Sequence, residues 1–150
     1  MAVGTFTPYS NAIFNISKAL INLSSDTFVM ILATTSYTPA PDTNATFTNL
    51  SANEVANGLG YTTGGVVLTG VSNTLSSATV TWTTASATWA TATFTCRYGI
   101  ICKRAAGSLV AGDLLVGFVD LTGSGSVTGQ GGSFVVAPNA GGWFSLTHSP

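Results

Sequence analysis

The residues whose types and spacing could do chemistry gather in one stretch, residues 53–70, which reads NEVANGLGYTTGGVVLTG. A carboxylate, Glu54, precedes a cluster of glycines around the aromatic Tyr61, and these glycines are Gly58, Gly60, Gly64 and Gly65. A cluster of this kind can cradle a phosphate, form a catalytic turn, or let the backbone turn a corner with positive φ angles.

The spacing of the glycines argues against a nucleotide site. The pattern G-x-G-x-x-x-G is not the dinucleotide-binding fingerprint, and the VVLTG that follows predicts a strand at 66–69, not a helix. No lysine follows a glycine as a P-loop requires. Ser51 and Glu54 have the spacing of a capping box, so a single helical turn is expected to end at Gly58. The stretch is therefore predicted to be a structural corner of a sheet.

The acidic residues are scattered along the chain, and no two are close in sequence. A pair could still meet in the fold, as in glycosidases, so that alternative stays open. The expected role of each acid is that of a turn, cap or loop residue, and we expect no catalytic residues and no enzymatic activity. The five acids are Asp26, Asp42, Glu54, Asp113 and Asp120.

The cysteines and the single histidine also make a poor site. His148 lies two residues from the C-terminus, where chains commonly fray. Cys96 and Cys102 fall on one face of a predicted strand, about 20 Å apart, too far for a disulfide unless the chain reverses at Gly99. Two cysteines and one histidine are too few for an ordinary zinc site. We therefore expect free, buried thiols and no metal or cofactor.

Composition indicates a chain that associates with other proteins. Its 150 residues predict one domain, 1–150, and only 6% are charged, against roughly 25% in an ordinary soluble protein. The net charge of −1 leaves little repulsion between copies. Without a basic excess, a nucleic-acid partner is not expected.

Mean hydropathy is +0.44, yet no segment resembles a membrane span. The longest apolar run, residues 28–33, is far shorter than the roughly 20 residues that a spanning helix needs. The opening MAVGTFTPYS has no basic and apolar leader. We expect no membrane partner.

One helix and several strands are predicted. Residues 10–24 carry an apolar stripe, Ile13, Ile16, Leu20 and Leu23, that predicts an amphipathic helix covering its own sheet or docking on a partner. Alternating or continuous apolar runs predict strands at 27–33, 79–83, 90–103, 114–121, 133–137 and 143–147, with 79–83 beside 90–103. The expected fold is mainly β, an antiparallel β-sandwich or barrel with one N-terminal amphipathic helix packed on it.

An ordered set of short motifs resembles a family of small tailed-bacteriophage virion proteins. The set comprises Tyr37-Thr-Pro with Asp42, the pattern NEV–G–GYT–GG–L from Asn53 to Leu68, Trp89 before T-x-RY-x-I-I at 95–101, and LV-x-x-x-D ending at Asp120. The similarity runs from about residue 10 to residue 146. It implies a protein of the virion, assembled in the bacterial host cytoplasm.

The sequence is compatible with three functions. The first is a capsid decoration (cement) protein that bridges neighbouring subunits of the major capsid protein. This chain is then expected to form a homo-oligomer, with a trimer as the expected state. The second is a neck, tail or fibre-associated virion protein. The third, of another class, is a carbohydrate-binding β-sandwich in which an exposed Trp89 or Trp143 stacks on a sugar ring; tryptophans of this kind are more commonly part of the core.

Overall fold

A computed structural model describes residues 4–149, and it is mainly β with antiparallel pairing and an α-helix near the N-terminus, which confirms the predicted fold class. The elements, in chain order, are β1 (Thr7–Pro8), α1 (Ser10–Ser17), β2 (Thr27–Ala33), the 3-10 helices η1 (Phe47–Asn49) and η2 (Ser51–Asn53), β3 (Val66–Val67), β4 (Ser72–Ser76), β5 (Thr79–Thr83), β6 (Ala87–Trp89), β7 (Thr95–Cys96), β8 (Tyr98–Arg104), β9 (Leu115–Asp120), β10 (Val127–Thr128), β11 (Phe134–Val136) and β12 (Phe144–Thr147).

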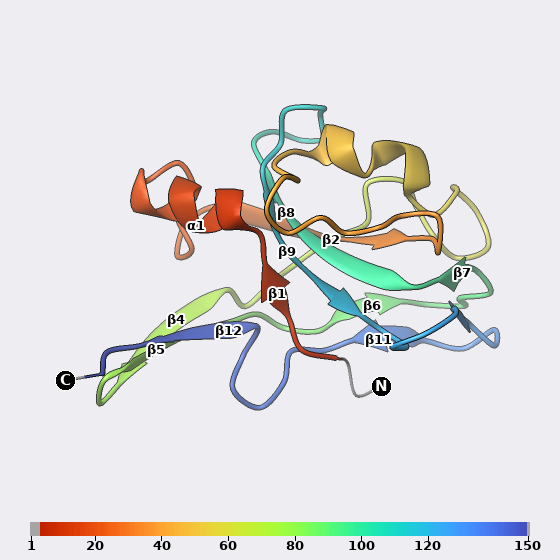
Figure 1. Cartoon of the computed structure of the whole chain (residues 1–150). Helices are drawn as coiled ribbons and strands as arrows, with labels where there is room; N and C mark the ends of the chain where they lie inside the picture. Colours follow the sequence, from red (N-terminus) through yellow and green to blue (C-terminus); the bar gives the residue numbers. More distant parts are fainter. Residues whose placement is uncertain (1–3, 150) are drawn as a thin grey trace.

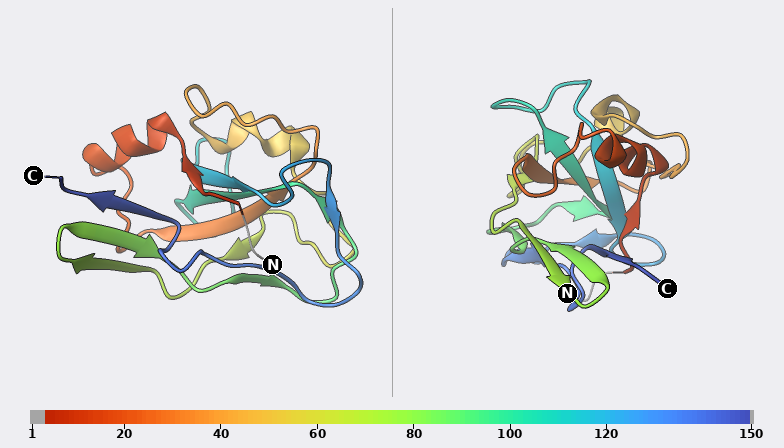
Figure 2. Two further views of the ribbon diagram at one scale, coloured as in Figure 1. Left: turned by 60° about the horizontal axis from the view of Figure 1, so that its bottom comes forward. Right: turned by 90° about the vertical axis from the view of Figure 1, so that its left-hand side faces the viewer.

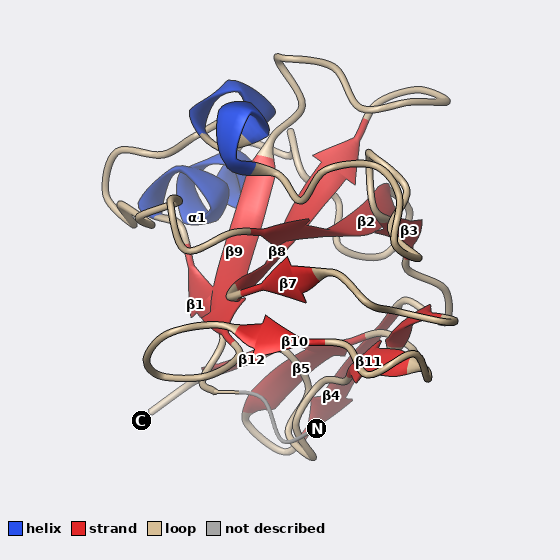
Figure 3. Ribbon diagram, turned by 90° about the vertical axis from the view of Figure 1, so that its right-hand side faces the viewer, coloured by secondary structure: helices blue, strands red, loops and turns tan. Residues whose placement is uncertain are grey.

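The elements form layers around a shared core. A five-stranded sheet has the order β1-β9-β8-β2-β3, and α1 with the 3-10 helices lies over one of its faces (Figure 1). A second layer, made of the sheet β12-β5-β4 and the pair β11–β6, lies against the other face (Figure 2). The short pair β7–β10 lies between the layers at one end of the molecule (Figure 3).

The centre of the larger sheet is the antiparallel pair β2–β8, which runs from Thr27 opposite Arg104 to Ala33 opposite Tyr98. Every residue of β2 after Thr27 is buried, because the second layer covers one face and the helical layer covers the other. Phe28, for example, meets Trp82 of β5 edge-on, with ring centroids 5.1 Å apart. The prediction of a strand at 27–33 covered on both faces is confirmed.

The prediction of a single strand at 90–103 is wrong, because this segment contains two strands, β7 and β8. The backbone turns at Thr91, whose φ is 52°; β7 then pairs with β10, and only β8 enters the large sheet. Ile101, which interrupts the alternation in the sequence, is fully buried because β8 is covered on both faces. Likewise β5 is not a neighbour of β8: it pairs with β4 and β12. The strands predicted at 114–121, 133–137 and 143–147 correspond to β9, β11 and β12 with slightly shorter bounds.

The helix predicted over 10–24 ends at Ser17, and its apolar stripe is largely exposed. After Lys18 the backbone takes a left-handed turn at Ala19 (φ 58°), which carries Ile21 into the core through a loop. Ala12 is the buried residue of α1. The larger apolar residues that the helix was expected to bury stay in solvent: Ile13 is 57%, Phe14 59% and Leu20 47% exposed. No helix within residues 4–149 is long and apolar enough to cross a membrane.

Candidate functional site

The glycine corner places Glu54 and Tyr61 against the end of β2 as a brace. Tyr61 is buried; its hydroxyl donates to Glu54 Oε1 (2.7 Å) and accepts from the backbone N–H of Leu32 (3.2 Å). The same carboxylate oxygen accepts the N–H of Gly64 (2.6 Å). Burial, reinforced by the Glu54 charge, raises the pKa of the Tyr61 phenol well above its ordinary value. The phenol therefore stays neutral and serves as a hydrogen-bonding strut.

The capping box predicted from Ser51 to Glu54 does not form. Ser51 to Asn53 make one turn of 3-10 helix, and the capping box instead joins Thr46 to Asn49. Glu54 is extended and bridges to Ala33, so its side chain is turned toward Tyr61 and away from the start of η2. The corner turns the chain into β3 with positive φ angles at its glycines, as their spacing predicted, and its carboxylate bonds to a phenol and a glycine N–H.

The other acids are each held by a neighbouring group. Asp26 pairs with Lys103 (2.9 Å), and Asp42 accepts from the Ser10 hydroxyl (2.8 Å). The buried Asp113 accepts two backbone N–H groups, of Ala105 and Val110, and so closes the loop between β8 and β9. No three His, Cys, Asp or Glu side chains within the described range 4–149 lie close enough together to hold a metal ion.

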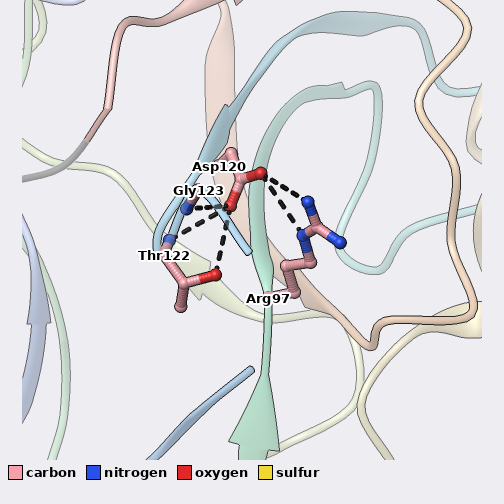
Figure 4. Close-up of polar contacts among 4 residues, drawn as sticks. All are labelled: Arg97, Asp120, Thr122 and Gly123. Atoms are coloured by element: carbon pink, nitrogen blue, oxygen red, sulfur yellow. Dashed lines mark hydrogen bonds and ion pairs between the residues drawn. The ribbon is translucent and has the colours of Figure 1, made fainter. Parts of the chain in front are cut away.

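Asp120 forms the most extensive of these arrangements (Figure 4). Its Oδ2 accepts from Arg97 Nη2 (2.9 Å) and Nε (3.3 Å). Its Oδ1 accepts the N–H groups of Thr122 (3.1 Å) and Gly123 (2.9 Å). Burial alone would raise the pKa of this carboxyl, but the donors from Arg97 and from the turn outweigh it and lower the pKa below its ordinary value of 3.8. The carboxylate thus ties the end of β9 to the residue that precedes β8.

The lowered pKa of Asp120 predicts a specific loss of stability in acid. Because the folded-state pKa lies below the unfolded one, the contribution is full above the unfolded value and disappears as pH falls through the folded value. Asp120→Asn should therefore lower the free energy of unfolding near neutral pH, and the difference from wild type should narrow on acidification. Urea titrations at a series of pH values, from neutral down through the folded-state pKa of Asp120, test this prediction, with Asp42→Asn as the control. Parallel pH profiles for wild type and Asp120→Asn would contradict it.

The cysteines and the histidine stay apart. Cys96 and Cys102 are both free and buried, as predicted. Burial raises the pKa of the Cys96 thiol to about 12, and burial followed by the nearby Asp113 charge raises that of Cys102. Both are therefore weak nucleophiles. His148 follows β12 with an exposed side chain, while its backbone N–H donates to Ala78 (2.8 Å).

Neither tryptophan proposed to stack on a sugar is exposed. Trp89 is 3% and Trp143 4% exposed. The Trp89 ring is stacked beside Tyr61 at 6.2 Å, and the Trp143 indole N–H donates to Thr84 Oγ1 (2.9 Å). Both rings are parts of the core, so the aromatic faces on which the carbohydrate hypothesis depended are already covered.

The structure does bring together a site that the sequence did not indicate, an apolar cleft of ≈ 320 Å³ between the loop after α1 and the three-stranded sheet. Figure 1 shows α1 and this loop above the free end of β4, β5 and β12. Among residues 4–149, no charged side chain lines it. We call this hollow the cleft. The residues that line it are Ile16, Ala19, Ile21, Asn22, Leu23, Ser24, Asn73, Val80, Trp82, Phe144 and Leu146.

The register of the sheet explains why the cleft is apolar. Val80 lies opposite both Leu75 and Leu146, and Trp82 lies opposite Phe144. Directly opposed residues share a face of a sheet, so one face carries a continuous apolar strip. Its inner end is buried at Trp82, whereas Leu146 and Leu75 are 58% and 73% exposed. An apolar hollow of this form can hold apolar side chains of a ligand or partner.

No protein-family model, curated protein or solved structure matches the chain. The functional interpretation therefore depends on the cleft, on the exposed side of α1, and on the resemblance in sequence.

Proposed function

We propose that this chain is a non-enzymatic structural protein of a tailed-phage virion, a capsid decoration protein that bridges neighbouring subunits of the shell. The observation that supports this best is the cleft, which Ile16 of α1 helps to line; Ile13 and Phe14 of the same helix are also exposed. Exposed apolar area concentrated on one part of a soluble protein is typical of an interaction surface. The sequence motifs that resemble phage virion proteins supply the class of partner.

The energetics suit a bridging role. Fully burying one large apolar side chain contributes roughly 1.5–3 kcal/mol, and Ile13, Phe14 and Leu146 are each a little over half exposed. Covering them against a subunit would therefore contribute on the order of 1 kcal/mol each. A surface with few charges also has little polar desolvation to offset this gain. In this proposal an apolar segment of the major capsid protein occupies the cleft.

Self-association is part of the same proposal. We propose a closed homo-oligomer, with a trimer as the state that matches the threefold positions of a shell. Sedimentation of the purified protein tests this: a strict monomer that also fails to bind shells would contradict both the oligomer and the decoration role.

A single cleft substitution separates docking from folding. Leu146→Asp places a charge at the mouth of the cleft, at a side chain that is already exposed. We expect unchanged thermal melting and at least roughly tenfold weaker binding to empty shells prepared without the protein. The matched control is Leu59→Asp: Leu59 is 69% exposed, lies outside the cleft, and has a left-handed φ of 54° that Asp tolerates. Equal effects of the two variants would contradict the assignment of the cleft.

The position in the particle is tested independently. Virions of the phage that encodes the chain, labelled with an antibody and viewed in negative stain, should carry label over the head. Label confined to the neck, tail or fibres would replace decoration by the second hypothesis. Absence from the virion would contradict the proposal as a whole.

A further inference from the structure

A second hollow, of ≈ 250 Å³, lies between the glycine corner and the loop that follows β8. Thr63, Gly64 and Gly65 form one side, and Gly107 to Leu109 form the other. Phe47 of η1 and the side chain of Arg104, the last residue of β8, complete it. It shares no residue with the cleft, and we call it the Arg104 pocket.

Among residues 4–149, the guanidinium in this pocket has no carboxylate partner. Of the four basic residues, Arg97 pairs with Asp120 and Lys103 with Asp26, while Lys18 lies over the Phe14 ring. Within residues 4–149, Arg104 makes no ion pair with any carboxylate, and its Nε is buried without a hydrogen-bond acceptor. A buried donor of a charged group left without an acceptor is costly, and such groups are normally satisfied. The Nε–H of Arg104 is therefore a donor that an acceptor from outside the chain could satisfy.

A ligand of this donor would carry acceptor oxygens. A planar guanidinium presents parallel N–H groups that match a carboxylate in a bidentate pair. The pocket has room beside it, because a methyl group built at Gly64 or at Gly107 would meet no atom within 4 Å. The Glu54 carboxylate accepts the N–H of Gly64, which lines the pocket. A nearby negative charge disfavours a dianion such as phosphate more than a singly charged carboxylate.

We propose that the Arg104 pocket binds the side-chain carboxylate of an Asp or Glu supplied by a neighbouring protein subunit. The pocket follows from the Arg104 Nε–H without an acceptor and from the open space beside it; the subunit as the source of the carboxylate rests on the proposed virion function. In that setting the pocket fixes the orientation of this chain on the neighbouring subunit, since a buried ion pair discriminates among partners through its geometry. The cleft supplies the apolar area that is buried on docking.

Acetate is the probe for the pocket itself. In ¹⁵N-labelled protein, the Arg104 Nε–H resonance and the amides of Gly64 and Gly107 should shift saturably with sodium acetate and not with sodium chloride at equal ionic strength. The Arg97 Nε–H, already paired, should not shift. Arg104→Lys keeps the charge but loses the planar fork, and should weaken acetate binding at least severalfold at the two glycine amides. No saturable shift, or inorganic phosphate binding more tightly than acetate, would overturn the carboxylate site.

Particle binding is the probe for the source. Arg104→Gln should bind empty shells roughly tenfold more weakly than wild type, whereas Gln130→Ala, at an exposed residue outside both the cleft and the pocket, should bind like wild type. If acetate binds the pocket but Arg104→Gln binds shells normally, the carboxylate comes from a small molecule and the subunit as its source is overturned. If wild type and both variants all fail to bind shells while acetate still saturates the pocket, the proposed virion function is contradicted and the carboxylate site is supported.

Discussion

Replacing Gly65 by alanine should destabilise the protein more than the same change at any other glycine of the corner. Gly65 has a φ of +70°, which costs an L-residue about 1–2 kcal/mol. A methyl group there would also overlap the carbonyl oxygen of Met30 in β2. Overpacking of this kind typically adds about 1–3 kcal/mol, so we expect a total loss of roughly 2–5 kcal/mol in the free energy of unfolding.

Gly64 provides a matched control within the same turn. Its φ of +93° is also left-handed, but a methyl group at this position would meet no atom within 4 Å. Gly64→Ala should therefore show the backbone strain alone, and urea titration of both variants isolates the overlap with Met30. Gly60→Ala should fall between them, since its methyl group would lie 2.6 Å from the carbonyl oxygen of Thr91. Equal losses at Gly64 and Gly65 would contradict this account of the corner.

The corner also shows what the sequence could and could not predict. The glycine spacing correctly indicated a structural turn leading into a strand, because positive φ angles are a local property of glycine. It could not indicate that Glu54 bonds to Tyr61, because capping-box spacing is equally local and offered Glu54 a nearer partner. The contact that prevails depends on the approach of β2, which is distant in sequence.

The same distinction explains the strands. β2 was predicted with its observed bounds because an unbroken apolar run means burial on both faces wherever the strand lies. Alternation across 90–103 reported which side chains are buried, as Cys96 and Ile100 are, but not that the chain moves from one sheet to another between them. Pairing partners are set by contacts between distant segments, and one sequence contains no direct signal for them.

The helix was overextended for a related reason. The stripe Ile13, Ile16, Leu20 and Leu23 has helical spacing, but the left-handed turn at Ala19 allows Ile21 and Leu23 to reach the core by a loop. That departure creates the cleft, which needs the loop after α1 above three strands that pair only in the fold. Leu75 of β4 and Leu146 of β12 each stand between polar residues, and both lie opposite Val80 once their strands pair with β5. This alternation is the sequence signal that could have pointed to the cleft.

The motifs that carry the resemblance to phage virion proteins turn out to be paired with one another. Arg97 of the third motif bonds Asp120 of the fourth, and Glu54 bonds Tyr61 within the second. Trp89 packs beside Tyr61. These residues brace the fold, so what the motifs describe is a scaffold, while the cleft and the Arg104 pocket lie mostly outside them.

Trp82 joins the two layers and forms the inner wall of the cleft. The side chain is 1% exposed, packs on Phe28 (5.1 Å) and Phe144 (5.5 Å), and donates its indole N–H to the carbonyl of Leu23 (2.9 Å). Trp82→Ala should lower the free energy of unfolding by about 3–5 kcal/mol, through lost contacts and the cavity left behind. That is a large share of the roughly 5–15 kcal/mol that keeps a domain folded.

Trp82→Phe separates the packing from the hydrogen bond. Phenylalanine keeps an aromatic ring against Phe28 but leaves the Leu23 carbonyl without its donor, which should cost about 1–3 kcal/mol. Because Leu23 also lines the cleft, the freed loop should move more, and shell binding should weaken in Trp82→Phe even at temperatures where the protein remains folded. Denaturant titration with a parallel shell-binding assay measures both effects. A Trp82→Phe variant that loses stability but binds shells like wild type would show that the cleft wall is not the docking surface, because the loop above it would have loosened without consequence.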